Sequence, residues 1–523
     1  MICLCLTGER LAENEDILRR YRSAVDLVEL RVDLLSPDEC AGLVGDPGLV
    51  RHSFPNVSRL LTCRRKSDGG DWNGSEEERL ELLNTLSGRG FSYVDVEEDV
   101  PDKVVREIGN HGATIVRSLH SFEGVPENPV EVLDRLSRGG AIAKLACSVG
   151  DTNAVASLVD AAFSRPPGNH IVLGMGKYGL VTRLLAPRLG SAWTYCSPGD
   201  ARQAAPGQVD PRELVERFGY RRIHPETSLF AIVGDPVGHS KSPEYHNARF
   251  IRDNLNAVYT AFPASDFEAF LRVARRIGLT GASVTVPHKA SAARLADETD
   301  DSVRETGACN TLIREYDTYL GTNTDIPGFL DPLRPLFDRI RSATIIGAGG
   351  AARACAFALL SRGTDVCIAN RTESKAHELA GELNAAMARM SRRDPGFRPG
   401  AAVPARLPRR REDIAEYRSL IVQTTSCGMT PEDDGDPIPD YSFDGSEIVY
   451  DIVYSPPVTR LLQRAERAGC ATVPGGRMFE AQAAVQYELF RRAYWAETRR
   501  HGSGTPQYNG HDRGAESLPW LRR

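Results

Sequence analysis

Residues 343–353 read ATIIGAGGAAR, a short apolar strand that runs through closely spaced glycines into an alanine-rich helix. This is G-x-G-x-x-A at a strand–helix junction, where small residues let the chain approach a pyrophosphate closely. We therefore predict a doubly wound Rossmann domain over residues 331–455, built around this stretch. The candidate nucleotide contacts are Gly347, Gly349, Gly350 and Ala351.

The next strand, residues 365–369, ends in groups that bear on the type of dinucleotide. An NAD site normally presents Asp or Glu there, to bond the ribose hydroxyls. This sequence instead offers amide, hydroxyl and basic groups: Asn370, Arg371, Thr372 and Lys375. These groups suit the 2′-phosphate of NADP. We prefer that interpretation to the alternative, in which they are solvated residues at a helix start.

Upstream, residues 228–330 carry a set of polar residues of a different kind. Ser240 and Ser242 stand in a turn that enters a helix, where hydroxyls and main-chain N–H groups form a small anion site. A cap and a turn explain either serine, but not the whole polar run around them. A lysine, an acid, an amide and a hydroxyl follow near predicted strand ends: Thr285, Lys289, Asn310 and Asp325. This set suits a polyhydroxylated acid and a proton relay.

Residues 1–222 alternate short apolar runs with amphipathic stretches. The expected strands are 2–6, 27–34, 59–64, 92–96, 113–120, 141–147, 170–174 and 192–196. Eight strand–helix units in about 220 residues have the count and length of a parallel eight-stranded (TIM) barrel. An open doubly wound sheet is the alternative. In either fold, functional groups gather at the carboxyl ends of the strands.

Polar and charged residues stand at nearly all of these strand ends. Glu29 and Arg31 alone, two apart on one strand face, would be explained as a structural ion pair. The whole set is harder to explain that way: Glu29, Arg31, Arg64, Asp68, His120, Lys144, Arg183 and Gln208. Lys144 lies inside the apolar run AIAKLA, and burying an unpaired ammonium is costly. We expect a catalytic pocket at this end of the barrel.

The residue types in this pocket indicate a particular chemistry. A lysine in a cationic, partly desolvated pocket has a lowered pKa and attacks a ketone as the free amine. The resulting iminium acidifies the neighbouring carbon, and a histidine removes that proton and protonates a departing hydroxyl. Arginines recognise a carboxylate. We infer Schiff-base dehydration of a β-hydroxy ketone that bears a carboxylate, with Lys144 and His120 as catalytic residues.

The composition excludes several other classes of protein. A chain of 523 residues is too long for one core, and its net charge of −6 gives no global basic field for nucleic acid. No apolar run approaches the ~20 residues that span a bilayer. The 11 cysteines lack regular spacing, which predicts reduced thiols in a cytoplasmic protein, and no C-x-x-C or His/Cys cluster indicates a metal site. The start, MICLCLTGE, lacks a basic segment followed by a long apolar stretch, so no signal peptide is expected.

The predicted domains follow from these patterns. They are a barrel at 1–222, a substrate-binding domain at 228–330 that is rejoined by 456–496, the Rossmann domain at 331–455 and a flexible tail at 497–523. The arginine-rich stretch 389–411 is expected to be a poorly ordered surface insertion. Nucleic-acid binding is the weaker alternative, because no aromatic residues alternate with the arginines.

The first half resembles type I 3-dehydroquinate dehydratase. The resemblance rests on ELRVD at 29–33, Thr62 and Arg64 before Gly69-Gly70, Ser118 with His120 and Phe122, the Lys144 strand, Met175-Gly176 with Arg183, and PGQ at 206–208. It implies that Lys144 forms the imine, His120 is the acid/base and Arg183 holds the substrate carboxylate. Glu29, Arg31, Arg64 and Gln208 would line the site.

Two residues depart from that family's pattern. Asp68 stands where the family usually has a glutamate that supports the histidine, and Ala204 stands where it usually has a serine in the lid. We expect weaker substrate binding rather than loss of activity.

The second half, over 228–496, resembles shikimate dehydrogenase. Further matches are QTTSCGM at 423–429, DIVYSP at 451–456 and GGRMFEAQA at 475–483. The resemblance implies that Ser240 and Ser242 bind the substrate carboxylate, and that Lys289 and Asp325 are the catalytic pair. Thr285, Asn310 and Gln482 would contact hydroxyls, Tyr454 would border the pocket, and Gly475 and Met478 would contact NADP. Ser283 stands where the family often has asparagine, which removes an expected contact.

Together the two resemblances imply a bifunctional enzyme that converts 3-dehydroquinate to 3-dehydroshikimate and then, with NADPH, to shikimate. The partners would be small molecules alone, with no membrane, and the protein a monomer or homodimer. The alternatives are a dehydrogenase half that prefers quinate, a non-catalytic metabolite sensor, and a first half that Asp68 and Ala204 have silenced.

Overall fold

The computed structural model describes residues 1–199, 205–238 and 240–500. The chain divides into two compact units, Met1–Leu279 and Thr280–Arg523. Within the described ranges, no helix is long and apolar enough to cross a bilayer.

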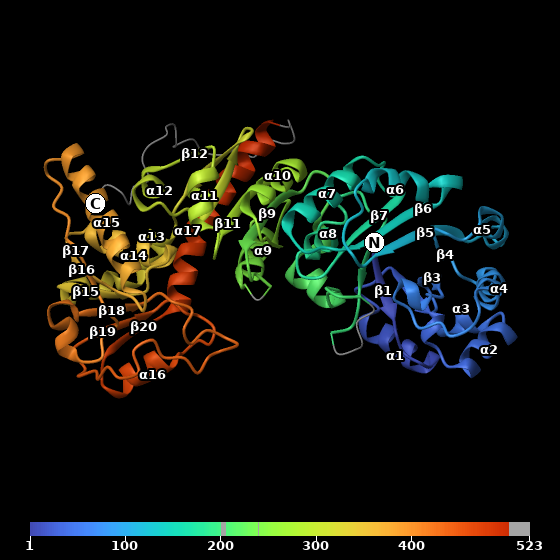
Figure 1. Ribbon diagram of the computed structural model, residues 1–523, viewed down its shortest axis with the longest axis horizontal. Coiled ribbons are helices and arrows are strands. Elements are labelled where there is room, and N and C mark those ends of the chain that lie inside the picture. The colour runs from blue at the N-terminus through green and yellow to red at the C-terminus, as the bar shows by residue number, and fades with distance from the viewer. Residues whose placement is uncertain (200–204, 239, 501–523) are drawn as a thin grey trace. The chain divides into compact units, whose positions relative to one another are not determined.

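The first unit opens with eight parallel strands that form a near-closed barrel (Figure 1). They are β1 (Ile2–Leu6), β2 (Leu27–Arg31), β3 (Ser58–Thr62), β4 (Tyr93–Glu97), β5 (Thr114–Ser121), β6 (Ile142–Ser148), β7 (His170–Met175) and β8 (Thr194–Cys196). The order is β7-β6-β5-β4-β3-β2-β1-β8. The two ends of the sheet meet where the N–H of Ala192 donates to the carbonyl of His170 over 2.8 Å. The predicted barrel is confirmed.

Helices follow most of the strands and cover the barrel. They are α1 (Leu11–Tyr21), α2 (Pro37–Gly45), α3 (Leu49–Ser53), α4 (Glu76–Ser87), α5 (Asp102–Gly109), α6 (Pro129–Leu136), α7 (Thr152–Phe163) and α8 (Leu180–Leu184). Local sequence explains where they begin. In α4, for example, Ser75 and Glu78 form a reciprocal capping box. Inside the barrel, Cys3, Leu60, Val116 and Trp193 belong to one buried apolar cluster.

The chain continues from the barrel through η4 (Glu213–Arg217) and η5 (Tyr220–Arg222) into two βα pairs of the same unit. These are β9 (Ser228–Gly234), α9 (Ser242–Arg252), β10 (Ala257–Pro263) and α10 (Phe267–Ile277). β9 and β10 pair in parallel. Helix α10 packs on α7 of the barrel, and Ser265 exchanges hydrogen bonds of 2.8–3.0 Å with Thr152. The domain boundary predicted near the linker stays a prediction.

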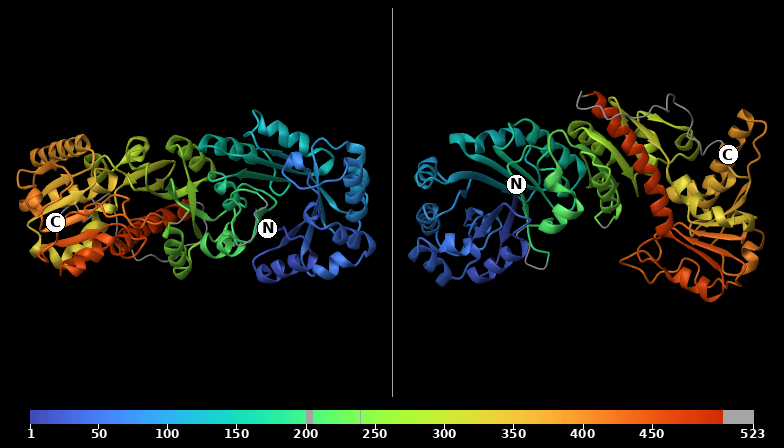
Figure 2. Two further views of the ribbon diagram at one scale, coloured as in Figure 1. Left: turned by 60° about the horizontal axis from the view of Figure 1, so that its bottom comes forward. Right: turned by 180° about the vertical axis from the view of Figure 1, so that it is seen from behind.

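The second unit contains a small mixed sheet and the helices around it. β11 (Leu279–Val284) pairs antiparallel with β13 (Thr311–Glu315), β13 with β14 (Thr318–Thr322), and β14 in parallel with β12 (Glu298–Thr299). The helices are α11 (Lys289–Leu295), α12 (Asp301–Thr306), α13 (Asp325–Leu330), η6 (Asp331–Arg339) and α17 (Gly475–Arg500). The long α17, red in Figure 2, packs on α13 and β13.

Between α13 and α17 lies a six-stranded parallel sheet in the order β17-β16-β15-β18-β19-β20. The strands are β15 (Ser342–Ile346), β16 (Asp365–Ala369), β17 (Ala402–Ala405), β18 (Leu420–Gln423), β19 (Ile448–Asp451) and β20 (Ala471–Pro474). This is the strand order of a dinucleotide-binding fold. Its helices and 3-10 turn are α14 (Gly350–Leu360), α15 (Glu373–Arg393), η7 (Arg411–Tyr417) and α16 (Arg460–Arg467).

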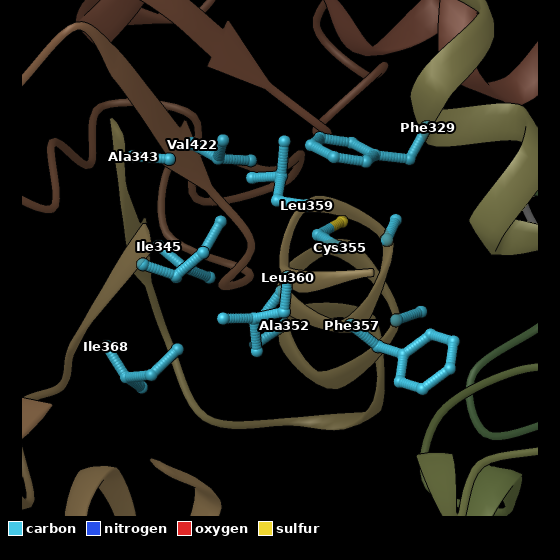
Figure 3. Packing of buried hydrophobic residues seen from close by; sticks show 14 of the residues in the cluster. Phe329, Ala343, Ile345, Ala352, Cys355, Phe357, Leu359, Leu360, Ile368 and Val422 are labelled. Carbon is cyan, nitrogen blue, oxygen red and sulfur yellow. The ribbon is translucent and has the colours of Figure 1, made fainter. Parts of the chain in front are cut away.

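The core of this domain explains why the stretch at 343–353 folds as predicted. Figure 3 shows Ala352, Cys355 and Leu359 of α14 packed near Ile345 of β15 and Val422 of β18. Small side chains on the helix allow it to lie close to the sheet. The buried side chains are therefore closely packed, as in other protein interiors.

The prediction that 389–411 is poorly ordered was wrong where this stretch forms regular structure. Its start forms the last turns of α15, and its middle contains β17. Arg389 and Arg393 contact the buried carboxylate of Glu305 at 3.0 and 2.8 Å. These two arginines of the charge run share one buried acid. Residues 497–500 of the predicted tail continue α17, and 501–523 lie outside the described residues.

Candidate active sites

One pocket in the barrel gathers all eight residues predicted for the first site. Its lining includes Glu29, Arg31, Arg64, Asp68, His120, Lys144, Arg183 and Gln208. The parallel strands bring them together, because their carboxyl ends meet at the same end of the barrel. The residues of the lining that were not predicted as site residues include Cys5, Met175, Tyr195 and Ala205.

Lys144 is buried but not unpaired. Its Nζ donates to Oδ2 of Asp95 over 2.8 Å and lies 3.9 Å from Oε1 of Glu29. It also lies 4.4 Å from the centroid of the Tyr195 ring. The pocket contains the cations Arg31, Arg64 and Arg183, and the structure adds a carboxylate in direct contact with the ammonium.

Asp95 is the main residue that sequence reasoning missed. Besides Lys144, it accepts from Ser118 Oγ over 2.6 Å and pairs with Arg64 at 2.9 Å. Burial alone would raise the pKa of Asp95, but Arg64 and Lys144 outweigh it and hold that pKa below its ordinary value. Asp95 is thus a fixed anion that orients Lys144 and Arg64. The available signal was the spacing of two acids, Asp95 and Glu97, which lie two residues apart on β4.

The surroundings of His120 favour its neutral form. Burial lowers its pKa well below the ordinary value, and the neighbouring cations Arg64 and Lys144 lower it further. Its Nδ1 lies 3.3 Å from NH1 of Arg64, which also donates to Glu97 and Ser118. A neutral imidazole has one nitrogen that accepts a proton and one that donates, so His120 can take a proton from a bound substrate and return it.

Arg183 provides the site with a buried cation. Among the described residues, no carboxylate lies within ion-pair distance of it, its Nε has no hydrogen-bond partner, and a weak 3.4 Å bond joins its NH1 to the carbonyl of Tyr195. Burial lowers its pKa to about 10. A desolvated guanidinium without an anion is costly, so an anion such as a carboxylate would be favoured at this position.

The remaining side chains of the pocket hold one another in place. Glu29 accepts from Thr62 Oγ1 over 2.9 Å and from Cys5 Sγ over 3.1 Å, and Gln208 donates to Cys5 over 3.2 Å. Arg31 is held by Asp33 through two bonds of 2.9 and 2.6 Å. Polar groups with fixed partners keep their geometry when a substrate enters.

The two departures in the first site have different outcomes. Asp68 lines the pocket, but its carboxylate accepts from Arg65 and Ser67, each over 2.8 Å, and makes no contact with His120. The expected support of His120 by Asp68 is therefore absent from this arrangement, and the short side chain explains why. Ala204 lies outside the described residues.

Ser240 and Ser242 lie in the first unit, where the chain enters α9. Both are buried, Ser240 Oγ donates to Ser242 Oγ over 3.2 Å, and Ser240 Oγ accepts from the Ser242 N–H over 3.2 Å. The two hydroxyls are thus oriented together at a helix start. Hydroxyls and main-chain N–H groups in this position favour an anion.

The second unit contains a compact lysine–acid pair. Lys289 Nζ, at the start of α11, donates to Asp325 Oδ2 over 2.5 Å. Asn310 Nδ2 donates to the other oxygen of Asp325 over 2.7 Å. The two predicted catalytic residues and the predicted amide are therefore joined, and each oxygen of the carboxylate has its own donor.

Gln482 and Gln486 of α17 complete this polar cluster. Gln482 Oε1 lies 3.5 Å from Thr324 Oγ1, which also contacts Asn310. Gln486 was missed by sequence reasoning. It accepts from Ser283 over 2.9 Å and donates to Thr311 over 2.8 Å. Ser283, the departure noted above, thus bonds a side chain of α17.

The other residues predicted around this cluster have different surroundings. Thr285 is partly exposed, and its carbonyl accepts from the His288 N–H over 2.9 Å. The ring of Tyr454 lies 5.2 Å from that of Phe479. Neither observation defines a ligand contact.

The glycine loop after β15 lies next to the side chain of Lys289. Gly347 has φ +118°, and a Cβ there would meet Thr424 Oγ1 at 2.6 Å. A Cβ on Gly350 would meet the side chain of Lys289 at 3.2 Å. Around Gly349 the space is open. These residues fit a dinucleotide whose pyrophosphate lies at the start of α14.

The residues after β16 present basic groups to solvent. Arg371, Thr372 and Lys375 are exposed, and Asn370 donates to the carbonyl of Thr372 over 2.8 Å. Within the described part of the chain, Arg371 and Lys375 form no ion pair, so both cations are free to meet a phosphate.

The last two predicted cofactor residues lie at the start of α17. Gly475 approaches the carbonyls of Ile452 and Val453, where a Cβ would come within 2.4 Å. Met478 is 6% exposed and belongs to the apolar core of the domain. Its predicted contact with the nucleotide stays a prediction. In the described residues, no group of three or more His, Cys, Asp or Glu could hold a metal ion.

Comparisons with known proteins agree with this geometry. Family models match type I 3-dehydroquinase over residues 2–225, the shikimate dehydrogenase substrate binding domain over 232–312, and shikimate/quinate 5-dehydrogenase over 336–393. The bifunctional 3-dehydroquinate dehydratase/shikimate dehydrogenase of Arabidopsis thaliana, described as chloroplastic, is 32% identical over 508 residues, which are 91% of this chain and 80% of that protein. The chain belongs to this bifunctional family.

Two relatives of the dehydrogenase half alone illustrate how far it extends. The shikimate dehydrogenase (NADP(+)) of Methanopyrus kandleri is 39% identical over 279 residues, 51% of this chain and 91% of that protein. A shikimate 5-dehydrogenase structure from Thermus thermophilus, in complex with NADP(H) and shikimate, is 32% identical and covers 52% of this chain and 99% of its own, with a TM-score of 0.42.

Proposed function

We propose that this bifunctional dehydratase–dehydrogenase carries out its two reactions at the two sites described above. The barrel pocket would dehydrate 3-dehydroquinate, and the cluster around Lys289 would reduce 3-dehydroshikimate. One observation carries the proposal for the barrel: a buried lysine, a neutral histidine and an anion-free arginine share one pocket. A non-catalytic sensor would not need that combination.

In the barrel, the carboxylate of the substrate pairs with Arg183, which places its ketone at Lys144. The ammonium of Lys144 first transfers a proton to the ketone oxygen, and the resulting free amine adds to the carbonyl carbon. A second proton of the amine follows to that oxygen, which leaves as water and gives an iminium. His120 takes the proton from the neighbouring carbon and gives it to the departing hydroxyl. Water hydrolyses the iminium and frees Lys144. Asp95 holds Lys144 and Arg64 at fixed positions throughout.

In the dehydrogenase half, Ser240 and Ser242 would bind the carboxylate of 3-dehydroshikimate. NADPH, held by Gly347, Gly349, Gly350 and Ala351, supplies a hydride when bound. Lys289 donates a proton to the carbonyl oxygen as it becomes a hydroxyl, and Asp325 holds that lysine through their 2.5 Å bond.

The wild-type chain should oxidise NADPH when it is supplied with 3-dehydroquinate alone. The first site must make the substrate of the second for this to happen, so absorbance at the NADPH band reports both. Quinate, shikimate, NAD and NADP are tested side by side in the reverse direction. Faster turnover of quinate than of shikimate would replace our interpretation of the second substrate, and no oxidation with 3-dehydroquinate would contradict the dehydratase.

The free basic groups Arg371 and Lys375 support NADP over NAD. Arg371→Glu should raise the KM for NADPH by about tenfold to a hundredfold, because one charge-assisted hydrogen bond contributes roughly 1.5–3 kcal/mol. The KM for NADH should change little. Arg392→Glu, at an exposed arginine near the far end of α15, is the matched control. Equal effects on both cofactors would argue against contact with the 2′-phosphate.

Two further predictions concern the state of the protein. A cytoplasmic location is our proposal, and it differs from the printed description of the Arabidopsis relative as chloroplastic. A monomer or homodimer is expected, and sedimentation would distinguish them.

A further inference from the structure

A residue before the predicted linker is hydrogen-bonded to the segment that carries Ser240. Arg217, the last residue of η4, donates from NH2 to the main-chain carbonyl of Ser240 over 2.8 Å. The same guanidinium contacts Glu244 at 2.8 Å and Glu213 at 2.5 Å. Its side chain is 16% exposed, so it is largely shielded from solvent. Because two carboxylates hold its guanidinium, Arg217 presents a fixed donor.

The main chain of Arg217 is also tied to α9. Asn247 donates to the Arg217 carbonyl over 2.9 Å and to the Tyr259 carbonyl of β10 over 2.8 Å. Arg217 therefore connects to the region of Ser240 through both its side chain and its backbone. A displacement of Arg217 would therefore shift the segment around Ser240.

A second contact holds the beginning of the same segment. Asp235 directly follows β9 and accepts two bonds from Lys177 Nζ, over 2.8 and 2.7 Å, and one from Tyr178 OH over 2.8 Å. Lys177 and Tyr178 lie after β7, in the loop that leads to Arg183 and α8. Lys177 is 54% exposed, so its ion pair contributes little by itself. The hydroxyl of Tyr178 adds a directional hydrogen bond to this contact.

The hydrogen bond from Arg217 to the Ser240 carbonyl affects the positions of both serine hydroxyls. The orientation of the Ser240 peptide determines where its Oγ lies, and that oxygen both accepts from the Ser242 N–H and donates to Ser242 Oγ. A shift of this peptide would therefore move both hydroxyls. Small displacements of binding groups weaken substrate affinity strongly.

We propose that Arg217 is a positioning residue for the dehydrogenase reaction: from the barrel side of the linker, it fixes the Ser240 peptide so that both serine hydroxyls meet the substrate carboxylate. The Asp235 contact with Lys177 and Tyr178 is the secondary anchor. This inference rests on the proposed role of Ser240 and Ser242. It makes part of the barrel chain necessary for tight binding in the other half.

The test is steady-state reduction of 3-dehydroshikimate by the full chain at saturating NADPH. Arg217→Ala should raise the KM for 3-dehydroshikimate about tenfold, which corresponds to one lost charge-assisted hydrogen bond. The kcat, the KM for NADPH and the dehydratase activity should stay within about twofold. Arg217→Lys should recover part of the loss, since lysine keeps a donor but lacks the fork. Asp235→Asn should raise the KM by about twofold to threefold.

The matched control is Arg221→Ala, because Arg221 lies in η5 and contacts Asp26 and the Ala24 carbonyl instead. An unchanged KM in Arg217→Ala, or the same change in Arg221→Ala, would overturn the inference. If Arg217→Ala does not fold, Arg217→Lys and Asp235→Asn decide, and wild-type KM values in both would overturn it. Ser240→Ala and Ser242→Ala separate the two levels: if they leave KM unchanged, the proposed carboxylate site is wrong. If they raise KM while the Arg217 variants do not, this inference alone is wrong.

Discussion

Lys144→Ala is expected to lower dehydratase kcat by about 10⁴-fold or more, the scale on which loss of a covalent nucleophile acts. Borohydride in the presence of 3-dehydroquinate should add a covalent mass at Lys144 in the wild type and none in the variant. The reason lies in the pocket: among the described residues, no other lysine is part of its lining. Intact mass spectrometry and peptide mapping measure the adduct.

The variant should remain folded, which makes the result interpretable. Removing Lys144 leaves Asp95 with Arg64 at 2.9 Å and Ser118 at 2.6 Å, so the buried carboxylate keeps partners. Reduction of 3-dehydroshikimate by the same chain is the internal control and should keep its wild-type rate. NADPH oxidation from 3-dehydroquinate should be lost. A wild-type chain that gains no adduct would contradict the imine mechanism.

The architecture could be predicted from sequence because strand patterns and glycine motifs are local. All eight barrel strands lie within a few residues of the expected ranges, and the stretch at 343–353 forms the predicted strand, loop and helix. Polar residues at strand ends identified the first pocket, since parallel strands bring those ends together. For the same reason, the eight predicted residues line one cavity.

The partner of each polar group could not be predicted, because it depends on register across strands. Ser118 on β5 lies opposite Lys144 on β6, while Asp95 on β4 is opposite Val116. Asp95 therefore reaches Lys144 across an intervening strand, which no local pattern encodes. The length of one side chain has a similar effect at Asp68, which bonds Arg65 and not His120. The order of 389–393 likewise depends on Glu305, a distant residue in the sequence.

Lys289→Ala should lower the kcat of the dehydrogenase by about 10²–10⁴-fold, the contribution expected of a positioned general acid. Asp325 would keep its 2.7 Å bond from Asn310, so its carboxylate stays in place and the domain stays folded. The dehydratase rate should be unchanged, and Lys103→Ala, an exposed lysine on α5, controls for loss of a charge. Stopped-flow reduction of 3-dehydroshikimate measures the chemical step.

The double variant Lys289→Ala/Asp325→Asn distinguishes a catalytic pair from two independent residues. Substitutions of groups that act as one unit have strongly non-additive effects. The kcat of the double variant should therefore be no lower than that of the worse single variant. The 2.5 Å bond between Lys289 and Asp325 is the structural reason to expect this. If the fold-losses of kcat in the two single variants multiply in the double variant, the two side chains serve different steps, with Lys289 acting on the substrate alone. Gly350 lies against Lys289, so each variant is assayed at saturating NADPH to keep a change in cofactor affinity from imitating a change in chemistry.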